Sequence, residues 1–185
     1  IYHAEPSLLP GGFLGVDVFF VISGYLITAL LLREHDSTHH IDMRRFWRRR
    51  ARRLGPALLV MLSVVVVVGR LWLPRSQWGS LRGDELASLG YVMNWRLILT
   101  GDSYFSTFAV SPLRHVWSLS VEEQFYLVWP IVAAIAMARS RRALALVASA
   151  AFVASVAAMT LVGGGLSRVY YGTDTRLHVI MAGCL

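Results

Sequence analysis

Four apolar runs, each about 20 residues long, constrain this chain more than any other feature of its sequence: residues 13–32, 54–73, 117–138 and 143–162. At a rise of about 1.5 Å per residue, a helix of that length crosses the roughly 30 Å hydrocarbon core of a bilayer. Lipid offers no partners to backbone polar groups, so these runs must be helical, including the β-branched stretch at 64–68. Residues 177–185 begin like a further span. The sequence therefore predicts an all-α, polytopic transmembrane helix bundle of about five helices.

Composition and charge support a membrane protein. The chain is 56% hydrophobic and 16% charged, with a mean hydropathy of +0.54, whereas an ordinary soluble domain is about a quarter charged. Its 18 basic residues, all arginine, exceed its 11 acids and give a net charge of +7. The excess is concentrated in residues 33–53, between two apolar runs, as in a cytoplasmic loop. We therefore predict a multi-pass protein of the plasma membrane, with the lipid bilayer as a partner and no nucleic-acid partner.

Residues 85–100 are harder to place, because this run is only about 16 residues long and contains Asn94 and Arg96. If it crossed the membrane, the second basic turn at 139–142 would lie outside. The positive-inside rule therefore favours a re-entrant or interfacial segment. The predicted topology has residues 33–53 and 139–142 inside, residues 1–12 and 163–176 outside, and residues 74–116 outside or re-entrant.

The sequence at the two ends of the chain predicts that it is part of a larger protein. The chain opens with Ile1 rather than Met and stops inside an apolar stretch, and no signal-peptide pattern precedes its first span. We expect residues 1–185 to form a partial transmembrane domain that is truncated at both ends.

Carboxylates inside the spans are candidate functional groups, because an unpaired charge in lipid is costly. Glu122 and Glu123 lie in the second turn of the third run. Ser118 and Tyr126 lie four residues either side of Glu122, on roughly the same helix face, so both hydroxyls are expected to hydrogen-bond its carboxylate. We favour a functional role for Glu122 and headgroup solvation for Glu123. Asp17 fits a helix-start residue favoured by the macrodipole and a site residue equally well.

Histidine and cysteine give weaker signals. His3 lies near the outer interface, and histidine is a natural base for activating a hydroxyl, although on the residues alone a plain interfacial histidine is preferred. The lone Cys184 excludes an internal disulfide and a multi-thiolate zinc site, and we predict no metal site. The other histidines of the loops are interpreted as solvated or interfacial: His35, His39, His40 and His115.

The arginine block at 44–53 has two open interpretations. By default it fixes the topology or holds anionic lipid headgroups. Guanidinium groups also match phosphate geometry, so the block equally suits a polyphosphate ligand.

Four sequence blocks, in order along the chain, resemble the motifs of a known protein family. They are GVDVFFVISGYLI at 15–27, the basic segment 46–56 that ends Arg50-x-x-Arg53-x-x-Pro56, WSLSVEEQFYL at 117–127 with Pro130, and YYGTDTR at 170–176 with Gly183. Together these blocks resemble the acyltransferase 3 family. The members of that family are polytopic membrane enzymes that O-acylate, commonly O-acetylate, extracytoplasmic glycans and lipids.

The resemblance implies roles for particular residues. His3 matches the family's essential histidine and Glu122 matches the acid of its central motif, so both are expected to be catalytic. Arg50 and Arg53 match the family's Arg-x-x-Arg pair and are expected to bind acyl-CoA. The family pairs its histidine with an upstream arginine, whose position here precedes Ile1. The residues expected to line the substrate pocket are Asp17, Ser118, Tyr126 and Arg176.

The function that follows from the resemblance is acyl transfer. We expect acetyl-CoA, a co-substrate rather than a bound cofactor, to donate its acyl group from the cytoplasm to a hydroxyl of an extracytoplasmic glycan or lipid-linked sugar. One alternative is a proton-coupled secondary transporter, which predicts an inverted repeat and acids deep in the helices. A second is a non-catalytic membrane scaffold or sensor, which would tolerate loss of both His3 and Glu122.

Overall fold

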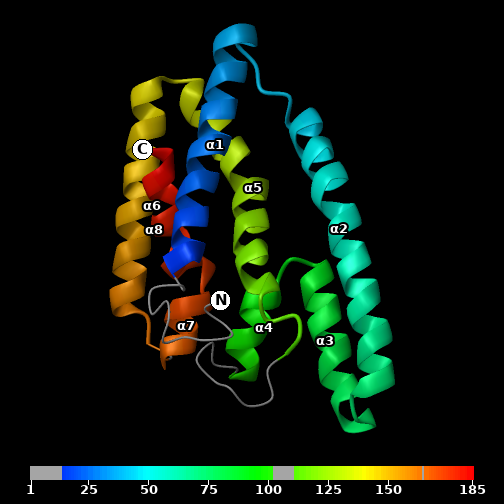
Figure 1. Ribbon diagram of the computed structural model, residues 1–185. Helices are drawn as coiled ribbons and strands as arrows, with labels where there is room; N and C mark the ends of the chain where they lie inside the picture. Colours follow the sequence, from blue (N-terminus) through cyan, green and yellow to red (C-terminus); the bar gives the residue numbers. More distant parts are fainter. Residues whose placement is uncertain (1–13, 102–110, 164) are drawn as a thin grey trace. The chain divides into compact units, whose positions relative to one another are not determined.

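The computed structural model describes residues 14–101, 111–163 and 165–185, and throughout these residues the regular structure is helical (Figure 1). This confirms the all-α prediction for the described residues. Four of the helices, α1, α2, α5 and α6, are long and apolar enough to cross a membrane. The elements in order are α1 (Leu14–Thr38), α2 (Met43–Trp72), the short 3-10 helix η1 (Arg75–Gln77), α3 (Trp78–Leu89), α4 (Met93–Thr100), α5 (Val116–Met137), α6 (Arg141–Leu161), α7 (Gly165–Tyr171) and α8 (Thr173–Cys184).

The basic segment is helical, which corrects the prediction of a polar loop over 33–53. α1 continues to Thr38 and α2 begins at Met43, so the connection is short. Asp42 caps α2 by accepting a hydrogen bond from the Arg45 amide at 2.9 Å. Pro56, the third residue of the predicted run 54–73, lies well inside α2. The apolar pattern marks only the lipid-facing length of a helix, whereas arginine is a good helix former and lets the helix continue beyond it.

Residues 85–100 form the end of α3 and all of α4, two short helices separated by a turn in which Tyr91 has a φ of 53°. Neither helix has the length of a span. The prediction that this run does not cross as one helix therefore agrees with the structure, while its re-entrant or interfacial position stays a prediction. The last apolar run is the C-terminal part of α8, whose helix begins earlier, at Thr173.

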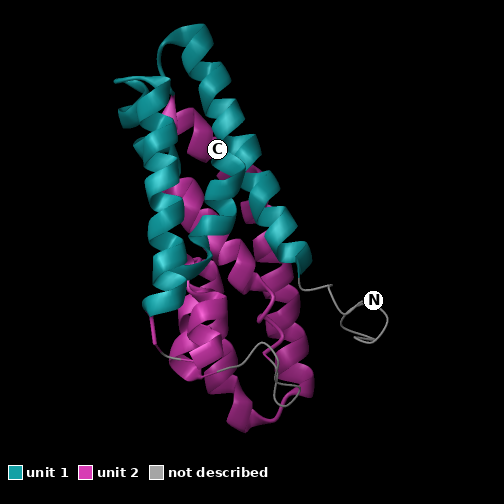
Figure 2. Cartoon of the chain, turned by 90° about the vertical axis from the view of Figure 1, so that its left-hand side faces the viewer, with its two compact units in different colours: residues 1–41, 129–161, 174–185 teal, residues 42–128, 162–173 magenta. Residues whose placement is uncertain are grey.

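The chain divides into two compact units, shown in different colours in Figure 2. Unit 1 comprises residues 1–41, 129–161 and 174–185, and unit 2 comprises residues 42–128 and 162–173. Unit 1 thus contains α1, the end of α5, α6 and nearly all of α8. Unit 2 holds α2, η1, α3, α4, the first half of α5 and α7.

Unit 1 is held together by a close crossing of α1 and α8. A Cβ atom added at Gly24 would overlap the carbonyl oxygen of Ile180, and one added at Gly183 would overlap that of Val21. Glycine therefore lets the two backbones touch. α1 also contacts the end of α5, where the Trp129 indole donates a 2.9 Å hydrogen bond to Thr28.

Unit 2 has a core in which α3 packs on α2 and α4, and α4 packs on α7. Gly69 of α2 faces Leu81 of α3, where an added Cβ would overlap the leucine side chain. At the start of α5 the Trp117 ring lies edge-on to Tyr171, with ring centroids 5.3 Å apart. This packing fixes the first turns of α5, which carry the acidic residues of the candidate site.

Candidate active site

Glu122 and Tyr126 form the centre of the candidate site in unit 2. Both side chains lie on α5 and are almost completely buried, at 5% and 4% exposure. The Tyr126 hydroxyl donates to a carboxylate oxygen of Glu122, so the contact predicted from their four-residue spacing is confirmed. The matching expectation for Ser118 was wrong, because its short side chain donates instead to the carbonyl of His115 at 3.4 Å. A pocket role for Ser118 stays a prediction.

Arg50 of α2 completes this cluster. Its guanidinium carbon lies 3.2 Å from the centroid of the Tyr126 ring, an arrangement in which the ring's π-electrons stabilise the cation. Its Nε lies 4.0 Å from an oxygen of Glu123, and the two side chains are only 20% and 16% exposed. The Trp47 indole ties α2 to the same turn of α5 through a 3.1 Å hydrogen bond to the Tyr126 carbonyl.

Two expectations change at this cluster. Glu123 was expected to be solvated by headgroup water, but it is mostly buried beside Arg50, because a long-range contact with α2 covers it. The family resemblance pairs Arg53 with Arg50, but the side chain of Arg53 is exposed on α2. The structure therefore brings Arg50, but not Arg53, to the acids of α5.

A closed ring of hydrogen bonds lies beside the acids. The Asn94 amide donates to Thr173 at 2.9 Å, Thr173 donates to the Gln124 amide oxygen at 2.6 Å, and Gln124 donates back to Asn94 at 3.0 Å. The remaining amide hydrogens go to carbonyls, from Asn94 to Tyr171 at 3.0 Å and from Gln124 to Tyr91 at 2.7 Å. Burial also raises the pKa of Tyr91, so its phenol stays protonated at neutral pH. Because these donors are used within the protein, the ring orients α5 rather than binding a substrate.

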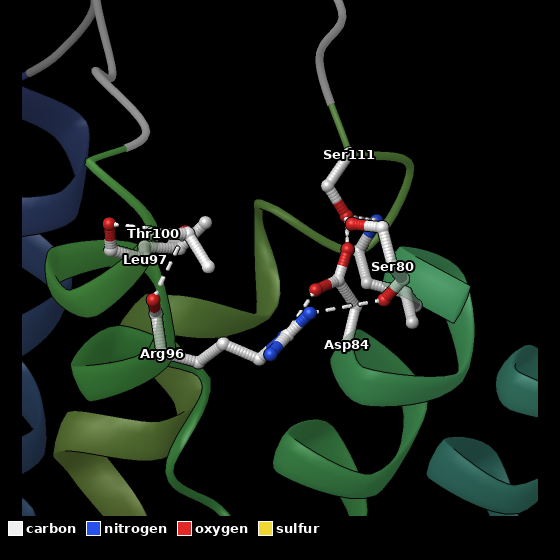
Figure 3. Close-up of polar contacts among 7 residues, drawn as sticks. Ser80, Asp84, Arg96, Leu97, Thr100 and Ser111 are labelled. Atoms are coloured by element: carbon white, nitrogen blue, oxygen red, sulfur yellow. Dashed lines mark hydrogen bonds and ion pairs between the residues drawn. The ribbon is translucent and has the colours of Figure 1, made fainter. Parts of the chain in front are cut away.

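A second charged contact fixes α3 and α4 against each other (Figure 3). Arg96 Nε lies 2.5 Å from one oxygen of Asp84, whose other oxygen accepts a 2.6 Å hydrogen bond from Ser111. The same guanidinium donates to the Ser80 carbonyl at 3.1 Å. Gly83 leaves the space that the guanidinium occupies. Arg96, which made this run a marginal span in the sequence, is thus neutralised by a buried carboxylate.

Asp17 and Arg176 form an ion pair in unit 1. A guanidinium nitrogen of Arg176 in α8 lies 2.5 Å from a carboxylate oxygen of Asp17 in α1. The side chains are 13% and 25% exposed, respectively. Asp17 also lies in the first turn of α1, so a favourable helix-start position and an ion pair with another helix occur together.

Several predicted residues lie apart from these contacts. His3 falls outside the described residues. His39, His40 and His115 are exposed, as expected, and the rings of His35 and His39 meet edge-on at 6.3 Å. Across the described ranges, no three His, Cys, Asp or Glu side chains gather as a metal site would require.

Sequence reasoning missed Asn94, Gln124 and Thr173 as a set. Gln124 lies in the block 117–127 and Thr173 in the block 170–176, and Asn94 is a polar residue in an apolar run. Their mutual contacts bring together segments that are far apart in sequence, and no spacing rule indicates such contacts.

These features define an integral membrane protein whose four long apolar helices accompany buried, charge-paired polar residues. A family model described as an acyltransferase domain matches residues 2–176, so the chain belongs to this acyltransferase family. The resemblance inferred from the motifs is thereby confirmed. The match favours acyl transfer over the transporter alternative.

Three bacterial relatives of the chain have names that describe O-acetyltransferases. The chain is 42% identical over 191 residues to O-acetyltransferase OatA of Staphylococcus aureus (strain NCTC 8325 / PS 47). It is 44% identical over 189 residues to the putative peptidoglycan O-acetyltransferase YrhL of Bacillus subtilis, and 43% identical over 189 residues to peptidoglycan O-acetyltransferase OatA of Listeria monocytogenes. The alignments cover 99–100% of this chain but 30–31% of the relatives, so the chain spans about a third of their length. No solved structure matches the chain.

Proposed function

We propose that this protein is the membrane part of an O-acetyltransferase that moves an acetyl group from cytoplasmic acetyl-CoA to a hydroxyl of peptidoglycan outside the plasma membrane. The observation that carries the proposal is the buried cluster of Glu122, Tyr126 and Arg50 in a chain of the acyltransferase family. The names of two relatives suggest peptidoglycan as the acceptor.

The reaction needs a base, a donor site and charge control. The acceptor oxygen attacks the thioester carbonyl carbon, so that a C–O bond forms and the C–S bond breaks. His3 takes the acceptor's proton as general base, and the coenzyme leaves as its thiol once a proton is delivered to the sulfur. Glu122 orients the reacting groups or balances the positive charge that develops on the base. Arg50 holds a phosphate of the donor, with Arg53 as a second phosphate contact at the exposed face of α2.

The contact between Arg50 and Glu123 supports a short path for the acyl group. Arg50 Nε lies 4.0 Å from a carboxylate oxygen of Glu123, the chain neighbour of Glu122 on α5. A donor held at Arg50 from the cytoplasmic side therefore lies close to the carboxylate of Glu122.

Replacing Glu122 tests the proposal. In full-length protein reconstituted in nanodiscs, we expect Glu122→Gln to lower kcat for acetyl transfer about 100-fold or more, because it removes a charge beside the reacting groups. Tyr126→Phe keeps the ring under Arg50 but deletes the hydroxyl. It should cost about 10-fold, the equivalent of one hydrogen bond to a charged group. The measurement is transfer of radiolabelled acetate from acetyl-CoA to soluble peptidoglycan fragments.

Ser149→Ala is the matched control, because Ser149 is exposed on α6 and its loss should leave the rate unchanged. Wild-type protein that drives proton-coupled flux in liposomes but transfers no acetate would contradict the proposal and favour the transporter. Native rates in the Glu122→Gln variant would remove this acid from the mechanism.

Arg50 is expected to act on the donor. Arg50→Gln should raise KM for acetyl-CoA about 10-fold, because one charge-assisted hydrogen bond to phosphate is lost. Arg142→Gln removes an exposed arginine of α6 and should change KM less than twofold. Steady-state kinetics with varied acetyl-CoA compare the two, and equal KM values would show that Arg50 does not bind the donor.

A further inference from the structure

Ser155 of α6 makes an unusual contact with α8 in unit 1. The side chain is buried, at 3% exposure. Its hydroxyl oxygen accepts a hydrogen bond from the His178 amide at 2.8 Å and donates one to the Asp174 carbonyl at 2.5 Å. In an α-helix these two backbone groups, four residues apart, are each other's partners. The serine of one helix therefore bridges a backbone pair of another.

A buried serine on a membrane helix commonly satisfies itself by donating to the carbonyl one turn earlier in its own helix. Ser155 donates to α8 instead. The His178 ring flanks the hydroxyl, with Nδ1 3.4 Å from the serine oxygen, and packs edge-on against Phe152 at 6.1 Å. A side chain that inserts into a helical hydrogen-bond ladder changes the local direction of that helix. The geometry of this turn of α8 thus depends on α6.

The turn that Ser155 bridges carries Arg176. This arginine lies midway between Asp174 and His178, and its guanidinium reaches Asp17 of α1 at 2.5 Å. A charge in this environment has to meet its partner with good geometry. The backbone of this turn determines where the Arg176 side chain points. The hydrogen bonds of Ser155 in turn fix that backbone.

We propose that Ser155 is a positioning residue, whose hydroxyl holds the first turn of α8 so that Arg176 stays paired with Asp17 and the pair can contact the acceptor glycan. This inference rests on the proposed function and deepens it. It assigns the pair to acceptor binding, because the proposed topology puts residues 163–176 and the first turn of α1 at the outer face, where the acceptor lies. It also makes α6 the support of that site.

Kinetics of Ser155→Ala in the full-length protein test the inference. We expect KM for a soluble peptidoglycan fragment to rise about 10-fold, with KM for acetyl-CoA changed less than twofold, because Arg176 is displaced while the donor site in unit 2 is untouched. A merely structural serine would lower the amount of active enzyme and kcat without this split. Ser149→Ala, on the exposed face of the same helix, is the control.

A double-mutant cycle with Arg176→Gln shows whether Ser155 acts through the arginine. If it does, Ser155→Ala should change acceptor KM less than twofold in the Arg176→Gln background. Independent, multiplying effects would overturn the inference, as would an unchanged acceptor KM in the single variant. The same cycle measured by thermal unfolding needs no activity. If the two substitutions are coupled in stability but the wild-type protein transfers no acetate, the proposed function is contradicted and the positioning role of Ser155 stands. If their shifts in melting temperature simply add, the positioning role itself is refuted.

Discussion

Arg176→Gln is expected to lower the free energy of unfolding by about 3 kcal/mol, because it leaves the Asp17 carboxylate without its nearest cation in a mostly buried position. Asp17→Asn should cost a similar or smaller amount, since this carboxylate is the more exposed partner at 25% against 13%. The double variant Asp17→Asn/Arg176→Gln should be less destabilised than the sum of the single variants, because no lone charge remains. Equilibrium unfolding in mixed detergent micelles measures all three.

The chain contains a matched control for this experiment. Asp36 of α1 and Arg141 of α6 are also 2.5 Å apart and belong to the same unit, but their side chains are 46% and 71% exposed. Solvent screens such a pair, so neutralising either partner should change stability by no more than about 1 kcal/mol. If Arg176→Gln lowered the free energy of unfolding no more than Arg141→Gln does, burial would not explain the contribution of the Asp17–Arg176 pair to stability.

Local features of the fold were predictable from the sequence. Run length and the absence of backbone partners in lipid predict helices, and α1, α2, α5 and α6 correspond to the four predicted runs. The four-residue spacing of Glu122 and Tyr126 predicts their contact for the same reason, because the geometry of one helix determines it. Helix ends were less predictable. Hydropathy reports where lipid ends, while the helical hydrogen-bond pattern of α2 continues through the arginines.

Contacts between helices were not predictable. The family resemblance placed both Asp17 and Arg176 in a pocket, but nothing in the sequence pairs residues that are 159 positions apart. The burial of Glu123 depends on Arg50 of α2, so the sequence of α5 alone predicts the wrong environment for this acid. Ser155 is one of many small residues in an apolar helix, and the role of its hydroxyl follows only from its hydrogen bonds with α8.

Gly183→Ala is expected to destabilise unit 1 by about 2–3 kcal/mol, although it adds a single methyl group and improves helix propensity. The new Cβ would overlap the carbonyl oxygen of Val21 and lie 2.9 Å from the amide nitrogen of Tyr25. Both are backbone atoms, so the overlap is relieved only if α1 and α8 move apart. Thermal unfolding of the purified protein in detergent measures the change.

Gly55→Ala supplies the opposite case. Gly55 lies inside α2 with nothing within 4 Å of an added Cβ, so alanine there should leave stability unchanged or raise it by up to about 1 kcal/mol. Gly24→Ala should resemble Gly183→Ala, because its Cβ would overlap the carbonyl oxygen of Ile180. The double variant at Gly24 and Gly183 should cost less than the sum, since one separation of α1 and α8 relieves both overlaps. Equal stability of the Gly183→Ala and Gly55→Ala variants would mean that the backbones of α1 and α8 do not touch at this crossing.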